Sequence, residues 1–395
     1  MAKDNFTVAT VLFSMVLAMA LAGVVYFRQN AIGAGLLAKT AAPAALAGVA
    51  DGGNQKSSAQ NEAADKAIVL PAPEIMLGQS FIVGIYGTSL DGQTTEYLEQ
   101  IKPAGIILYS RNYETKSQLK DFIAELQDVA QKTTGHDYFI MVDEEPGGAS
   151  RLGLFDNVFA FGTPDWATIE SDIKTMGSLG INVNLAPLAD FPFNEDTFIK
   201  KRIQAHTPAA LTDFNAKFIT LSQNNGVSAT LKHFPGMGVF IDDPHQKLPY
   251  VESSRQAVTE SLKIFKKGID AGADFVMTAH GVYDDIDYGI PATTSKKITS
   301  GILKKELGFN GLVMTDDLSD MPFIVGKQID LTDATLQSLE AGHDLVMFSH
   351  NQKKARGVYG KLLLQMQTDP ELKGVIEQNY RRVITFKSSH VLRAR

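Results

Sequence analysis

The sequence predicts an α/β protein that folds as a (β/α)8 barrel of the TIM type, in a single domain. Three observations carry this prediction. Eight short apolar segments recur along the chain, segments with helical periodicity lie between most of them, and polar residues follow nearly every apolar segment. With 395 residues, 44% of them hydrophobic, the chain can build a sizeable core. A doubly wound sheet is the alternative, because a periodic pattern does not show whether a sheet closes.

The apolar segments have the length and composition of buried strands. In order, they are residues 81–85, 105–109, 138–142, 181–185, 227–231, 274–279, 311–315 and 344–348. The helical segments include residues 115–132, 208–225, 253–271 and 330–341. The second of these has a clear start, because Thr207 is a favoured N-cap and Pro208 suits the first helical position.

Polar residues follow the second to the eighth apolar segment. In order, they are Arg111 and Asn112, then Asp143, Glu144 and Glu145, then Asp190, then Lys232 and His233, then His280, then Asp316 and Asp317, and last His350. The carboxyl ends of the strands of such a barrel meet at one mouth. The sequence therefore predicts that these side chains gather there around a site.

The first part of the chain predicts a membrane-associated segment outside the barrel. Residues 7–27 carry no charge, and about 20 apolar residues span a bilayer as a helix. We interpret residues 1–28 as a transmembrane anchor or a cleaved signal segment, and the length of the run favours the anchor. Residues 29–70 resemble a flexible linker, and residues 71–390 are the predicted barrel domain. An anchored chain would hold its barrel outside the cytoplasm, and a cleaved one would be secreted.

Composition argues against several classes of function. The formal net charge is −7 and no basic stripe is present, which argues against nucleic acid as a partner. The chain has no cysteine, which excludes disulfides, thiolate metal sites and a cysteine nucleophile. No closely spaced pair of histidines suggests a metal site, so we expect neither a metal nor another cofactor.

The densest group of ionisable residues follows the fifth apolar segment. Lys232 and His233 begin a stretch rich in Pro and Gly that runs on to Asp243 and His245. Donors at a strand end can hold the hydroxyl or carboxylate groups of a substrate. His245 is a candidate acid/base, because its ordinary pKa lies near neutral pH, and Asp243 could orient it. A solvated loop histidine is the alternative interpretation.

Asp316 is the candidate nucleophile. A carboxylate at a strand end can be held rigidly against an electrophilic carbon. The alternative is an N-cap for the following segment, which aspartate also favours. The sequence leaves these two roles open and allows Asp316 and Asp317 to take one each. Arg151 and Arg202 are possible substrate clamps, although a surface ion pair is the ordinary interpretation of a single arginine.

Several motifs resemble glycoside hydrolase family 3, in particular its single-domain β-N-acetylhexosaminidases of the NagZ type. The matching segments are residues 232–238 (KHFPGMG), 243–245 (DPH), 315–319 (TDDLS) and 143–151 (DEEPGGASR), with further echoes at 105–112, 185–190 and 291–295. Three residues depart from the family pattern: Met237 replaces a histidine, Pro244 a serine and Pro146 a glycine.

The resemblance implies a retaining enzyme that releases terminal N-acetylglucosamine from peptidoglycan or related sugar fragments through a covalent intermediate. It makes Asp316 the nucleophile, His245 the acid/base and Asp243 the partner of His245. It also implies that a group of side chains binds the sugar, namely Asp143, Arg151, Arg202, Lys232 and His233. Alternatives are a β-glucosidase or a phosphorolytic relative of the same family, and a decayed, membrane-tethered sugar-binding protein.

Overall fold

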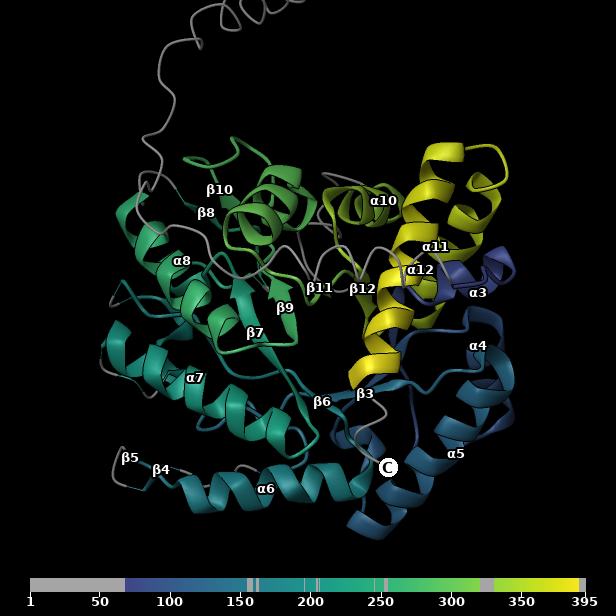
Figure 1. Ribbon diagram of the computed structural model, residues 1–395, viewed down its shortest axis with the longest axis horizontal. Helices are drawn as coiled ribbons and strands as arrows, with labels where there is room; N and C mark the ends of the chain where they lie inside the picture. The colour runs from purple at the N-terminus through teal and green to yellow at the C-terminus, as the bar shows by residue number, and fades with distance from the viewer. Residues whose placement is uncertain are drawn as a thin grey trace, which may run out of the picture. The chain divides into compact units, whose positions relative to one another are not determined.

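The computed structural model of the protein contains a closed barrel of eight parallel strands (Figure 1). The structure describes residues 68–154, 159–160, 163–194, 196–203, 205, 207–244, 246–251, 255–319 and 330–390. The strands follow the order β1-β12-β11-β9-β7-β6-β3-β2, and β1 pairs with both β2 and β12. This closure confirms the predicted barrel and excludes the doubly wound sheet.

Each predicted strand is present in the barrel. The strands are β1 (Phe81–Gly84), β2 (Gly105–Leu108), β3 (Phe139–Val142), β6 (Val183–Asn184), β7 (Ser228–Phe234), β9 (Phe275–Thr278), β11 (Leu312–Asp317) and β12 (Leu345–Phe348). Strands β7 and β11 run beyond their predicted ends, so Lys232, His233, Asp316 and Asp317 belong to the strands and not to the loops after them. The apolar pattern ends before the strands do, because the last paired residues of β7 and β11 include polar side chains.

Helices surround the barrel and include all four predicted helical segments. They are α3 (Pro73–Gly78), α4 (Gly92–Ile101), α5 (Lys116–Thr134), α6 (Trp166–Leu179), α7 (Pro208–Asn224), α8 (Arg255–Asp270), the π-helix η5 (Lys297–Glu306), α10 (Leu331–Ala341), α11 (Gln352–Gln365) and α12 (Pro370–His390). At the start of α7 the Thr207 side chain accepts a hydrogen bond from the Ala210 N–H, as the sequence predicts for an N-cap.

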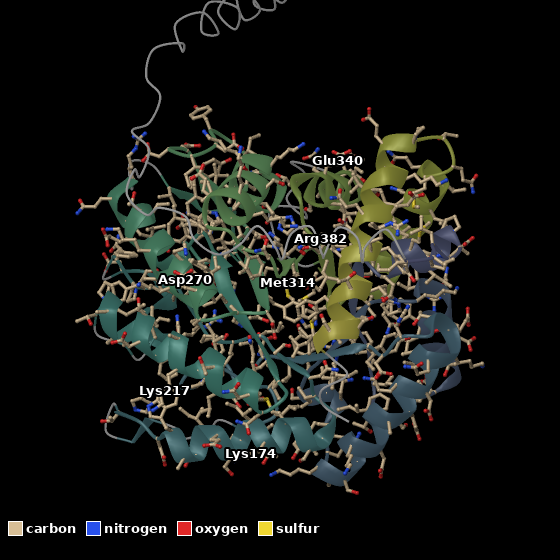
Figure 2. All side chains as sticks on the ribbon, in the orientation of Figure 1. Lys174, Lys217, Asp270, Met314, Glu340 and Arg382 are labelled. Atoms are coloured by element: carbon tan, nitrogen blue, oxygen red, sulfur yellow. The ribbon has the colours of Figure 1, made fainter. Side chains whose placement is uncertain are left out.

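The buried apolar residues form two layers, one inside the barrel and one between the strands and the surrounding helices. Met314 on β11 is fully buried within the barrel, whereas Lys174 on α6 and Asp270 on α8 lie on the outer helices (Figure 2). Strand residues alternate between these environments, because successive side chains point to opposite faces of a sheet. On β11, for example, Leu312 and Met314 belong to the inner core, and Val313 belongs to the core beneath the helices.

Helix α12 packs against the amino-terminal side of the strands. Its Phe386 ring lies 5.1 Å from the Phe275 ring and 6.0 Å from the Phe139 ring, and both partners begin a barrel strand. Arg382 of the same helix donates to Asp344, which lies just before β12, at 2.7 Å. Burial would raise the pKa of Asp344, but Lys304 and Arg382 lower it to about 2. This end of the barrel is therefore covered, and the opposite end carries the cavity described below.

The predicted anchor and nearly all of the predicted linker lie outside the described residues, which begin at residue 68. Within the described part of the chain, no helix combines the length and apolar character needed to cross a membrane.

Candidate active site

A cavity of about 270 Å³ lies at the carboxyl ends of the barrel strands. Part of its lining is apolar and comes from four strands. The residues are Ile107 on β2, Leu185 just after β6, Met277 on β9 and Met347 on β12. The intervening strands contribute polar side chains, among them Asp143 after β3, Lys232 on β7 and Asp316 on β11. This division follows the rule that alternate strands of such a barrel fill alternate layers.

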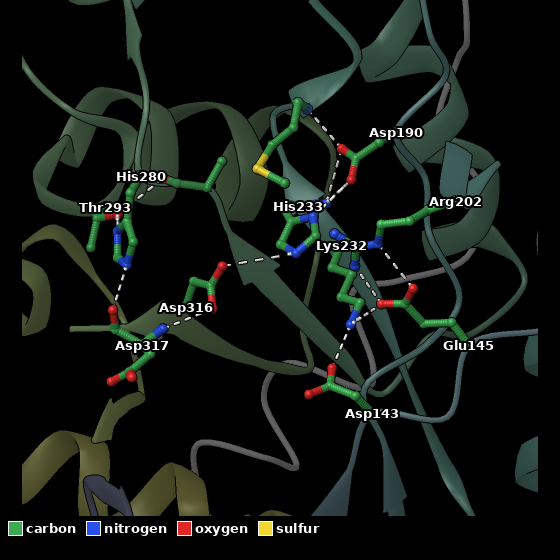
Figure 3. A network of polar contacts seen from close by, with 12 residues as sticks. Asp143, Glu145, Asp190, Arg202, Lys232, His233, His280, Thr293, Asp316 and Asp317 are labelled. Carbon is green, nitrogen blue, oxygen red and sulfur yellow. Dashed lines mark hydrogen bonds and ion pairs between the residues drawn. The ribbon is translucent and has the colours of Figure 1, made fainter. Parts of the chain in front are cut away.

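Lys232 lies between two carboxylates (Figure 3). Its Nζ is 2.6 Å from Asp143 Oδ1 and 2.7 Å from Glu145 Oε1, and the side chains of Lys232 and Glu145 are each only 2% exposed. Arg202, at the end of the 3₁₀ helix η2 (Phe198–Arg202), binds both oxygens of Glu145 at 2.5 and 3.1 Å. A bidentate arginine fixes the plane of a carboxylate, so this network holds Lys232 in place.

The charges in this network depend on one another. Burial would raise the pKa of Glu145, but Lys232 and Arg202 outweigh burial and hold that pKa well below its usual range. Burial would likewise lower the pKa of Lys232, but Asp143 and Glu145 raise it above its ordinary value. The ammonium group is therefore charged at neutral pH and can donate to a substrate hydroxyl in the cavity.

The loop after β3 brings Glu145 into this position. Both the N–H of Ala149 and the side chain of Arg202 donate to Glu145 Oε2, at 2.8 and 3.1 Å. A Cβ on Gly148 would lie 2.4 Å from the same oxygen, so the close approach of this loop requires glycine there. Arg151 follows on the same loop with its Nε 4.0 Å from Asp143 Oδ2, and it also lines the cavity.

His233 is oriented from behind by Asp190. Asp190 is fully buried and accepts from the backbone N–H groups of His233 and Met237. Its Oδ2 also lies 2.7 Å from His233 Nδ1. Because an ionised carboxylate only accepts, Nδ1 carries the proton, and Nε2 faces Asp316 Oδ2 at 3.9 Å. The backbone N–H of Met237 thus helps to hold Asp190.

Asp316 and Asp317 both line the cavity, but their carboxylates have different partners. Asp316 continues the inward series of Leu312 and Met314, and it lines the cavity with its side chain 21% exposed. Its Oδ1 accepts the backbone N–H of Asp317 at 2.8 Å. The position of Asp316 fits the proposed nucleophile, although the segment for which it could be an N-cap lies outside the described residues.

The Asp317 carboxylate links β11 to β12. It accepts the N–H and hydroxyl groups of both Ser319 and Ser349, at 2.6 to 3.2 Å. Its backbone carbonyl lies 3.1 Å from His280 Nε2 (Figure 3). Burial lowers the pKa of His280, which keeps this imidazole neutral near pH 7. Asp317 therefore acts as a support for the strand end that carries Asp316.

Most of the side chains predicted to form the site line this one cavity. They are Asp143, Arg151, Arg202, Lys232, His233 and Asp316. Asp243 is half-buried on the loop between the 3₁₀ helix η3 (Met237–Val239) and β8 (Tyr250–Val251), and it is not among the residues that line the cavity. His245 lies outside the described residues, so its place in the site stays a prediction.

The sequence predicts that Glu145 and Asp190 follow strands, but it does not indicate what either residue does. Their positions at strand ends were the available signal, and their partners Lys232, Arg202 and His233 are distant along the chain. Within the part of the chain that the structure describes, no group of three or more His, Asp or Glu residues could hold a metal ion.

Comparison with known proteins identifies the family of this chain. Residues 76–386 match the family described as "Glycosyl hydrolase family 3 N terminal domain". The chain belongs to glycoside hydrolase family 3. It is similar to the "Beta-hexosaminidase" of Xanthomonas campestris pv. campestris (strain B100), with 29% identity over 296 residues, which cover 70% of this chain and 86% of that protein.

Two solved structures share the fold. A β-N-acetylglucosaminidase from Paenibacillus sp. str. FPU-7 aligns with a TM-score of 0.74 and 27% identity, covering 82% of this chain and 64% of that one. The chain therefore spans slightly less than two thirds of that protein. A β-N-acetylhexosaminidase from Beutenbergia cavernae DSM 12333 aligns with a TM-score of 0.70 and 27% identity, covering 81% of this chain and 99% of its own.

Proposed function

We propose that this family 3 member is a retaining exo-glycosidase that releases a terminal β-linked N-acetylglucosamine from peptidoglycan or related sugar fragments. The observation that carries the proposal is the position of Asp316, which faces a small cavity also lined by Asp143, Lys232, His233 and Arg202. Relatives named β-hexosaminidase and β-N-acetylglucosaminidase support the choice of sugar.

The proposed reaction has two steps. Asp316 attacks the anomeric carbon, and the glycosidic bond breaks as His245 gives a proton to the leaving oxygen. His245 then removes a proton from water, which attacks the same carbon and releases the sugar and Asp316. The N–H of Asp317 holds the Asp316 carboxylate in line, and the charged Lys232 and Arg202 bind sugar hydroxyls.

Hydrolysis of an aryl N-acetyl-β-glucosaminide tests this proposal. We expect Asp316→Ala to lose turnover, because no covalent intermediate can form, and azide to restore release of the aryl group by taking the place of the carboxylate. Asp270→Ala on the outer face of α8 is the control and should keep full activity. Unchanged turnover in Asp316→Ala would refute the proposed nucleophile.

Two further measurements separate the alternatives from the main proposal. A wild-type protein that prefers an aryl β-glucoside would instead be a β-glucosidase. Calorimetry that detects sugar binding while long incubation yields no product would favour a binding protein.

We also propose that the barrel is held outside the cytoplasm by the apolar residues 7–27, with residues 29–70 as the tether. The absence of charge across residues 7–27 supports an anchor. Recovery of the full chain in the membrane fraction after alkaline extraction is expected. Recovery from the medium of a chain that lacks these residues would indicate cleavage and secretion.

A further inference from the structure

The order of the strands fixes how a sugar ring can lie in the cavity. Strand β3, which leads to Asp143, lies across the closed barrel from β11, which carries Asp316. In a pyranose, C4 lies across the ring from C1. If C1 meets Asp316, as the proposed function requires, a ring lying across the mouth places C4 near Asp143.

The two remaining edges of the ring then face different walls. Lys232 and His233 on β7 form one wall with charged and polar groups, which suits the neighbouring substituents on C2 and C3. The edge with the ring oxygen and the C5 hydroxymethyl group faces the opposite wall. That wall comes from β2 and β12 and includes Tyr109, Ser349 and His350.

His350 is held in one orientation by its neighbours. Its ring lies 4.7 Å from the Tyr109 ring, and its backbone carbonyl accepts a hydrogen bond from the Tyr86 hydroxyl. The guanidinium group of Arg111 lies over the rings of Tyr86 and Tyr109, 4.7 and 4.4 Å from their centroids. Arg111 also donates to the carbonyls of Ile85 and Ser349, at 2.9 and 2.7 Å.

Arg111 determines which nitrogen of His350 carries the proton. Its Nη1 lies 3.0 Å from His350 Nδ1. A guanidinium group can only donate, so Nδ1 accepts and the proton of the neutral imidazole lies on Nε2. His350 lines the cavity, and its Nδ1 is taken up by Arg111, so we infer that Nε2–H is the donor available to a ligand there.

We propose that His350 is a specificity-determining residue whose Nε2–H donates a hydrogen bond to the C6 hydroxyl of the bound sugar. The inference rests on the proposed function, since it uses Asp316 as the group that meets C1. It assigns recognition of the hydroxymethyl group to the wall opposite Lys232. The enzyme would then discriminate against sugars that lack this hydroxyl.

A cycle of two enzymes and two substrates tests the contact. The substrates are an aryl N-acetyl-β-glucosaminide and its 6-deoxy analogue, and the enzymes are wild type and His350→Phe. We expect wild type to lose about tenfold in kcat/KM on the 6-deoxy substrate, as for one neutral hydrogen bond. His350→Phe should lose a similar factor on the normal substrate and show almost no preference between the two.

His350→Gln is the matched variant, because its amide oxygen can accept from Arg111 while its N–H₂ group donates to the cavity. His350→Gln should keep most of the preference for the normal substrate over the 6-deoxy substrate. It also allows the contact to be tested if His350→Phe folds poorly. An equal fall on both substrates in His350→Phe, with the wild-type preference retained, would overturn the inference alone. A wild-type enzyme that hydrolyses neither substrate would overturn the proposed function and the inference with it.

Discussion

Replacing Glu145 by glutamine should weaken both the fold and the substrate site. The variant keeps the size of the side chain but removes the charge that faces Lys232 and Arg202. The amide N–H₂ group of glutamine would also face a group that donates to the Glu145 carboxylate, so two donors would meet. Lys232 would keep Asp143 as an anionic partner, and Arg202 would remain a half-buried cation without its bidentate partner.

The magnitude follows from the burial of the network. Removing one partner of a buried ion pair costs about 3–5 kcal/mol. Because Asp143 still pairs with Lys232 and the Arg202 side chain is 26% exposed, we expect the lower end, about 3 kcal/mol of unfolding free energy. A displaced Lys232 should also lower kcat/KM about 100-fold, the effect of a small misplacement of a binding group.

Urea unfolding and hydrolysis of the aryl substrate measure these effects. The pKa of Glu145 is lowered in the fold, so its stabilisation is present above its unfolded pKa of about 4.3 and is lost as the pH falls. The difference from wild type should thus be full at pH 7 and shrink below about pH 4. Glu170→Gln, which removes an exposed pair with Lys174, is the control and should cost less than about 1 kcal/mol. Equal stability of Glu145→Gln and Glu170→Gln would refute the reasoning.

Two further predictions concern Asp317 and Lys387. Asp317→Ala should lower kcat by about 10- to 100-fold with little change in KM, because the end of β11 loses its hydrogen bonds to Ser319 and Ser349. Asp317→Asn should restore most of the lost kcat. Its amide oxygen can still accept from Ser319, and the Ser349 hydroxyl can turn to accept from its N–H₂ group. Equal losses in the two variants would contradict a positioning role. Burial lowers the pKa of Lys387 to about 7, so the unfolded chain binds more protons between pH 7 and about 10.4, and stability should rise with pH across that window. Urea unfolding of Lys387→Met, which removes this group, should show a flatter pH dependence, and an unchanged slope would contradict the assignment.

Much of the barrel could be predicted from local pattern. Short apolar segments alternating with amphipathic ones indicate strands and helices, because burial on a strand or helix selects residues at fixed spacing. The same pattern placed Lys232, His233 and Asp316 near strand ends, where the described cavity lies. The pattern did not separate the roles of Asp316 and Asp317, because both follow the same apolar segment.

Contacts between distant segments could not be predicted in this way. Glu145 acquires its role from Lys232 and Arg202, which approach it only when the barrel forms. The same holds for Arg111 and His350, which are 239 positions apart. Sequence periodicity reports which face of an element is buried, whereas the neighbours of that face depend on strand order and register.

The sequence by itself therefore determined the class of fold, the family resemblance and the residues able to do chemistry. The tertiary structure decided that the sheet closes, that β3 lies across from β11, and which polar side chains share the cavity. The physical reason is that propensity and periodicity act over a few neighbouring residues. Closure, by contrast, depends on pairing between β1 and β12, which are the first and last strands of the barrel in the sequence.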